Sequence, residues 1–135
     1  MIKYRKTYII IVVVTFSLFL CSCATMPLNY GDIGKVAREN ESMIIIQRAN
    51  VFLGSAVKMN VYLNDQLRLT LGNGDEGMII VPNGTHTLFA EINYATKSEI
   101  ILVNTTSNRI NFFATPKMGL LKNSIDLLQM YETPL

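Results

Sequence analysis

The sequence predicts an all-β domain, either a small antiparallel β-sandwich or a small barrel of about seven to eight strands. Short runs of aliphatic and β-branched residues recur at intervals near ten residues, and glycine, proline and asparagine separate them. No long stretch has the 3.6-residue apolar period of a helix, which argues against a fold that alternates strands and helices. A chain of 135 residues has room for a single domain.

The first expected strand is the apolar run at residues 43–46, Met-Ile-Ile-Ile, which is typical of a strand buried on both faces. Residues 59–64 alternate between apolar and other side chains, the period of a half-buried strand. Asn64-Asp65-Gln66 supplies turn residues, and leucines alternate again over residues 67–71. The pattern from 59 to 71 therefore predicts a β-hairpin.

A glycine-rich loop at residues 72–77 leads into another apolar run at 78–81. Pro82-Asn83-Gly84 then predicts a tight turn, because proline presets its φ and glycine is free to adopt a positive one. In the strand that follows, Leu88, Ala90 and Ile92 share one face.

Two further strands are expected at residues 98–103 and 109–114. The last segment, residues 120–131, is open to two interpretations. Its apolar residues also fit one face of a helix, but a strand is favoured.

The start of the chain has the composition of a secretory signal. Residues 1–8 hold three basic residues and no acid, and an apolar run covers residues 9–20. A run of about 12 residues is shorter than the ~20 that a membrane-spanning helix needs. The alternative is an N-terminal membrane anchor that is not cleaved.

Leu20-Cys21-Ser22-Cys23 resembles the lipobox of bacterial lipoproteins. The resemblance implies cleavage after Ser22 and acylation of Cys23, and two or three acyl chains hold a protein stably on a membrane. Ala24 occupies the position after Cys23, as in lipoproteins exported to an outer membrane. We therefore expect a signal peptide at 1–22, a lipidated cysteine with a flexible tether at 23–41, and a β-sandwich at 42–135.

Three stretches carry a further signal: residues 48–56, 61–65 and 81–88. Together they resemble a family of bacterial lipoproteins with a domain of unassigned function, distantly similar to PEGA-type envelope domains. Asn64-Asp65 stands where that family has Asp-Gly, and Asn83 is inserted between Pro82 and Gly84. The resemblance implies an immunoglobulin-like or transthyretin-like sandwich in the cell envelope. The resemblance implies no catalytic residue in this chain.

Composition and motifs exclude several functions. Without the three basic residues of the signal, nine of the twelve basic residues remain against ten acidic ones, which argues against nucleic-acid binding. His86 is the only histidine, so neither a metal site nor a catalytic triad is predicted, and we expect His86 to hydrogen bond to the turn before it. Asp75 and Glu76 are adjacent acids that we expect to diverge into solvent.

Arg48, Phe52 and Tyr62 are the best candidates for an interaction site, because arginine and aromatic residues commonly anchor interfaces. The interpretation that we favour is nevertheless that both aromatics pack at the core edge while Arg48 extends its charged end to solvent. We expect a non-enzymatic, lipid-anchored envelope protein without cofactor or metal. Its partners would be the membrane, through acyl chains on Cys23, and an envelope protein. A small barrel or sandwich that binds an apolar ligand is the alternative.

Overall fold

A computed structural model describes residues 27–92, 96–119 and 122–135 of the chain. Within these ranges the chain forms nine strands and no helix. The expected signal peptide and the expected lipidation site at Cys23 lie outside the described residues. The strands are β1 (Glu41–Arg48), β2 (Met59–Leu63), β3 (Gln66–Leu71), β4 (Glu76–Pro82), β5 (Gly84–Ile92), β6 (Thr96–Lys97), β7 (Ile101–Thr105), β8 (Asn108–Lys117) and β9 (Ser124–Pro134).

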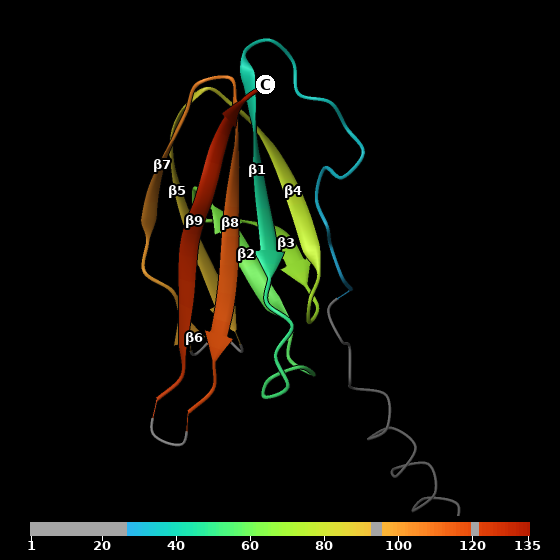
Figure 1. The fold of residues 1–135 in the computed structure, drawn as a ribbon, viewed down its shortest axis with the longest axis vertical. Helices are drawn as coiled ribbons and strands as arrows, with labels where there is room; N and C mark the ends of the chain where they lie inside the picture. Colours follow the sequence, from blue (N-terminus) through green and yellow to red (C-terminus); the bar gives the residue numbers. More distant parts are fainter. Residues whose placement is uncertain (1–26, 93–95, 120–121) are drawn as a thin grey trace, which may run out of the picture.

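The strands form two sheets that pack face to face (Figure 1). One has the order β4-β1-β8-β9, and the other has the order β3-β2-β5-β6, with β7 also paired to β5. Inward-facing side chains from both sheets fill the space between them and are almost completely buried, among them Ile44, Ile46 and Phe112 from one sheet and Val61 and Leu88 from the other. The predicted all-β sandwich is confirmed.

The first sheet is mixed rather than wholly antiparallel. β1 pairs antiparallel with β4, but it pairs parallel with β8, from Met43 opposite Arg109 to Arg48 opposite Ala114. A strand with neighbours on both edges is central, and Ile44, Ile45 and Ile46 are all buried. The predicted burial of this run on both faces is therefore confirmed, and continuous apolar runs are typical of parallel pairing.

The hairpin predicted from residues 59–71 is confirmed as β2 and β3. Asn64 and Asp65 form its two-residue turn with positive φ angles of 50° and 60°. These angles fit a type I′ turn, whose twist matches that of the flanking strands.

His86 hydrogen bonds at the point where the chain crosses from one sheet to the other. β4 and β5 belong to different sheets, and the turn after Pro82 joins them. His86 Nε2 lies 2.9 Å from the Pro82 carbonyl oxygen, and the Asn64 side-chain amide lies 3.0 Å from Nδ1. The ring therefore donates to the turn backbone through Nε2 and accepts through Nδ1, which confirms its expected structural role.

The C-terminal segment is a strand, as favoured. β9 pairs antiparallel with the whole of β8, from Ser124 opposite Lys117 to Pro134 opposite Asn108. Residues 120 and 121, which entered the helical alternative, lie outside the described residues.

The expectation of a flexible tether up to residue 41 needs correction for residues 29–32. The Asn29 and Thr70 backbones exchange two hydrogen bonds of 2.9 and 2.8 Å, which attaches this segment to β3. Three residues further on, the Asp32 amide donates to the Met78 carbonyl at 2.7 Å, which attaches the segment to β4. β3 and β4 are edge strands of opposite sheets, so the segment satisfies backbone groups along one open side of the sandwich.

Candidate functional site

Arg48 is buried at the end of β1 and organises the loop that follows. Its side chain faces the interior, and the residue is only 1% exposed. Its guanidinium donates to three backbone carbonyls: Nη1 lies 2.5 Å from Val57 O and 2.9 Å from Leu71 O, and Nη2 lies 3.0 Å from Gly54 O. The expectation that Arg48 extends into solvent is wrong, because these carbonyls bind both terminal nitrogens of the guanidinium inside the fold.

The electrostatics of Arg48 are those of a desolvated cation near one carboxylate. Burial lowers the pKa of its guanidinium, and the Asp75 carboxylate acts in the opposite direction. Asp75 is also tied down, since its Oδ2 accepts a hydrogen bond from the Gly72 amide at 2.7 Å. Its neighbour Glu76 is exposed, as expected, whereas Asp75 is half-buried and does not extend into solvent as predicted. Arg48 Nε is buried, and no residue that the structure describes hydrogen bonds to it.

Phe52 and Leu53 project from the loop whose base Arg48 holds. Phe52 is 93% exposed and Leu53 is 64% exposed. The chain turns directly after them, with the Ser55 amide 3.3 Å from Phe52 O and the Val57 amide 3.1 Å from Gly54 O. In Figure 1 this loop extends below the strands, between β1 and β2. The expectation that Phe52 packs at the core edge is therefore wrong.

Gly54 is required at this point of the loop. Its φ is +87°, and a Cβ atom there would lie 3.1 Å from Met118 Cγ. The connection between β8 and β9 therefore packs against the loop behind its apolar tip. A side chain at position 54 would strain the backbone and crowd Met118.

The turn before β4 hydrogen bonds to the residues that precede Phe52 in its loop. The Asn73 side chain accepts a hydrogen bond from the Val51 amide at 3.0 Å and donates to the Asn50 side chain at 2.6 Å. The glycine-rich turn before β4 is thus bonded to the residues that precede Phe52. We call residues 49–58 the apical loop, with Phe52 and Leu53 as its tip.

Tyr62 lies on a different surface from the apical loop. It is half-buried on β2 and stacks on Phe89 of β5, with ring centroids 4.8 Å apart and planes 5° apart. The Lys97 ammonium lies 5.4 Å from the centroid of the Phe89 ring. This stack covers the outer face of the second sheet, so of the three candidates only Arg48 and Phe52 belong to one site.

Leu53 and the Asn50–Asn73 bond were not predicted. Leu53 follows Phe52 directly and precedes a glycine, and an apolar pair before glycine was the available signal for an exposed tip. The Asn50–Asn73 bond had no such signal, because it joins residues 23 positions apart.

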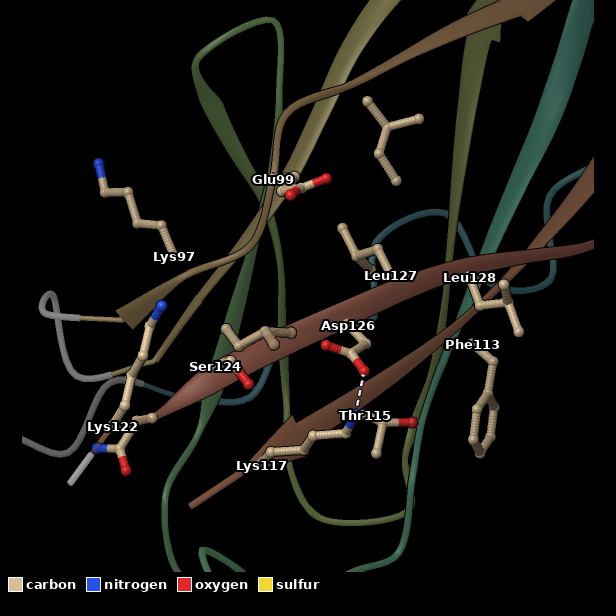
Figure 2. A pocket seen from close by; sticks show the side chains of 13 residues that line it. Lys97, Glu99, Phe113, Thr115, Lys117, Lys122, Ser124, Asp126, Leu127 and Leu128 are labelled. Atoms are coloured by element: carbon tan, nitrogen blue, oxygen red, sulfur yellow. Dashed lines mark ion pairs between the residues drawn. The ribbon is translucent and has the colours of Figure 1, made fainter. Parts of the chain in front are cut away.

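A groove of 650 Å³ lies at the other open side of the sandwich, around β9 (Figure 2). Its lining mixes charged residues such as Lys97, Glu99 and Lys122 with apolar ones such as Ile101 and Leu127. Lys117 and Asp126 form an ion pair of 2.5 Å across the β8–β9 pairing. Because the lining includes residues on both faces of β9, the groove follows a strand edge and is not an enclosed cavity.

Among the described residues, no three histidine, cysteine, aspartate or glutamate side chains lie close enough to hold a metal ion. The part of the chain that the structure describes contains no helix with the length and apolarity needed to cross a membrane. Comparison of the sequence with models of known protein families and with curated proteins finds no match.

Proposed function

We propose that this protein is a lipid-anchored lipoprotein of the bacterial envelope, whose β-sandwich serves as a non-enzymatic structural or interaction module. The observation that carries the proposal is the tetrapeptide Leu20-Cys21-Ser22-Cys23 at the end of a basic and apolar leader. Acyl chains on Cys23 hold the domain on the membrane, and Ala24 favours the outer membrane.

The way the chain enters the fold supports this proposal. Residues 29–32 are hydrogen bonded to the edges of both sheets. A pull on the anchor is therefore transmitted to the edges of two sheets and not to a single loose strand. The resemblance to PEGA-like envelope lipoproteins agrees with this location.

An apolar ligand inside the sandwich has less support. Side chains of both sheets fill the interior, with Ile46, Val61 and Leu88 fully buried. The groove around β9 is lined in part by lysine and acidic side chains, which do not match an apolar molecule.

Metabolic labelling with radioactive palmitate tests the anchor. The native protein and a Cys21→Ala variant should both take up label and sediment with membranes, whereas Cys23→Ala should take up none. Cys21→Ala is the matched control, because the second thiol lies two residues away in the same leader. Absence of label from the native protein would refute the proposal.

Cross-linking in intact cells tests the interaction role. The native protein should be cross-linked to at least one envelope protein. The Cys23→Ala protein should no longer be held on the membrane and should therefore not be cross-linked to that protein. A monomer that contacts only lipid would leave the anchor intact and count against an interaction module.

A further inference from the structure

We infer that the tip of the apical loop, Phe52 and Leu53, inserts into the headgroup region of the same membrane that holds the acyl chains of Cys23. This inference rests on the proposed lipid anchor and adds the orientation of the domain. It assigns the membrane-facing end of the sandwich and a second contact between protein and lipid.

The exposure of the tip is the first observation. Phe52 has 93% of its surface in solvent and Leu53 has 64%, although both are apolar. They are adjacent at the tip of one loop, so they form a single apolar projection. Phenylalanine and leucine are typical of the apolar face of segments that lie in a membrane interface, and an apolar projection there removes its surface from water.

The position of the tip is the second observation. A Cβ atom on Gly72 would lie 3.7 Å from the Leu28 side chain, so the start of the described chain lies beside the turn before β4. That turn is bonded through Asn73 to Asn50 and Val51, next to Phe52. The described chain thus begins, at residue 27, at the end of the sandwich where the tip projects, near the lower end of β4 in Figure 1.

The length of the connection is the third observation. Asn29 is already hydrogen bonded to β3. Between Cys23 and Leu28 the chain advances five residues, which reach at most roughly 18 Å when fully extended. This end of the sandwich therefore stays within a short distance of the headgroups, whereas a free tether over residues 23–41 would have allowed any orientation.

The support beneath the tip is the fourth observation. Arg48 holds the carbonyls of Gly54 and Val57, and Met118 packs against Gly54. The loop is therefore held in one conformation before it meets lipid, which reduces the entropy lost on insertion.

A single tryptophan provides the test, because the sequence contains none. Full-length protein carrying Phe52→Trp, extracted with its native lipid modification, is reconstituted into phosphatidylethanolamine and phosphatidylglycerol vesicles that contain brominated lipid. Val36→Trp is the matched control. Val36 is 83% exposed and lies in the segment before β1, in which Asn40 and Glu39 bond to the β4–β5 and β7–β8 turns.

We expect the Phe52→Trp protein to show blue-shifted emission and several-fold stronger quenching by bromine than the Val36→Trp protein. The depth should be about 5–10 Å, the usual burial of interfacial side chains. Equal and weak quenching of both proteins, while both float with the vesicles, would overturn the inference and leave the lipid anchor standing. If neither protein floats, the anchor and the inference fail together.

Discussion

At the scale of single residues, Arg48 is the side chain on which the apical loop depends. Its guanidinium is buried and donates to the carbonyls of Gly54, Val57 and Leu71. A buried cation requires this compensation, because a charge removed from water without partners is strongly destabilising. The residue therefore supports the exposed tip without being exposed itself.

Replacement of Arg48 by methionine should lower the free energy of unfolding by about 2–4 kcal/mol. A buried carbonyl that loses its donor costs about 1–3 kcal/mol, and of the three carbonyls Gly54 O keeps the Val57 amide as a donor. Arg48→Lys should have an intermediate effect, because one ammonium cannot reach all three carbonyls. Urea denaturation followed by far-ultraviolet circular dichroism measures the free energy of unfolding of both variants.

Arg109→Met on the exposed side of β8 is the matched control and should change stability by less than about 0.5 kcal/mol. Equal stability of the Arg48→Met and Arg109→Met proteins would show that the loop does not need the guanidinium.

Asp32 makes the attachment of the N-terminal segment dependent on pH. Partial burial alone would raise the pKa of Asp32, but the Ile80 amide donates to its carboxylate, and Lys35 and Arg68 lie nearby, so the pKa is below its ordinary value of 3.8. A carboxylate with a lowered pKa stabilises the fold above its unfolded pKa, and this contribution is lost as pH falls through the folded value.

We therefore expect residues 29–32 to detach from the sheets under acid conditions, below about pH 4, before the rest of the sandwich unfolds. Hydrogen exchange at the Asp32 and Met78 amides, corrected for intrinsic rates, measures this detachment. In Asp32→Asn protein the protection should be weaker at neutral pH and should no longer fall with acid. An unchanged acid response in that variant would assign the effect to another group.

At the scale of elements, the β2–β3 turn combines a favourable geometry with one suboptimal residue. Asp65 has a φ of 60°, which costs a residue with a Cβ about 1–2 kcal/mol relative to glycine. Asp65→Gly should raise the free energy of unfolding by up to about 1 kcal/mol, because part of the gain is offset by greater freedom of the unfolded chain. Asp65→Val should lower it by about 1–2 kcal/mol. A Gly variant less stable than native in urea would contradict this.

The elements that could be predicted are those with a local signal. The alternation at 59–71, the isoleucine run in β1 and the turn at Asn64-Asp65 each depend on neighbouring residues only, and each is found in the structure. The parallel pairing of β1 with β8 and the attachment of Asn29 to Thr70 depend on distant residues. The apolar pattern of one segment does not indicate which strand a distant segment will pair with.

The candidate site was predicted in part, for the same reason. Residue type drew attention to Arg48 and Phe52, and the structure places them at the base and tip of one loop. Their exposures are opposite to the usual preference for arginine outside and phenylalanine inside. Three backbone carbonyls allow Arg48 to be buried, and no residue type signals them, because every residue carries the same backbone carbonyl.

At the scale of the whole molecule, stability depends on the core between the sheets and not on the exposed aromatics. Phe112 is buried in that core and Phe52 is exposed, which gives two phenylalanines in opposite environments. Phe112→Ala should lower the free energy of unfolding by about 3–5 kcal/mol through lost burial and the cavity left behind. Phe52→Ala should change it by less than about 0.5 kcal/mol.

Urea denaturation of the two proteins measures the difference. A large loss for Phe52→Ala would mean that the apical tip packs against the domain in solution, contrary to its exposure.

The parallel pairing of β1 with β8 also constrains the order of folding. Asn108, the first residue of β8, bonds to Ser42 across 66 positions of the chain. Synthesis proceeds from the N-terminus, so β1 can pair with β4 long before its other edge is occupied. Until β8 arrives, an isoleucine-rich strand presents free backbone groups to neighbouring chains, a state that favours aggregation. Chains interrupted before residue 108 should therefore be insoluble, and refolding should take milliseconds to seconds, as in other proteins dominated by distant pairings.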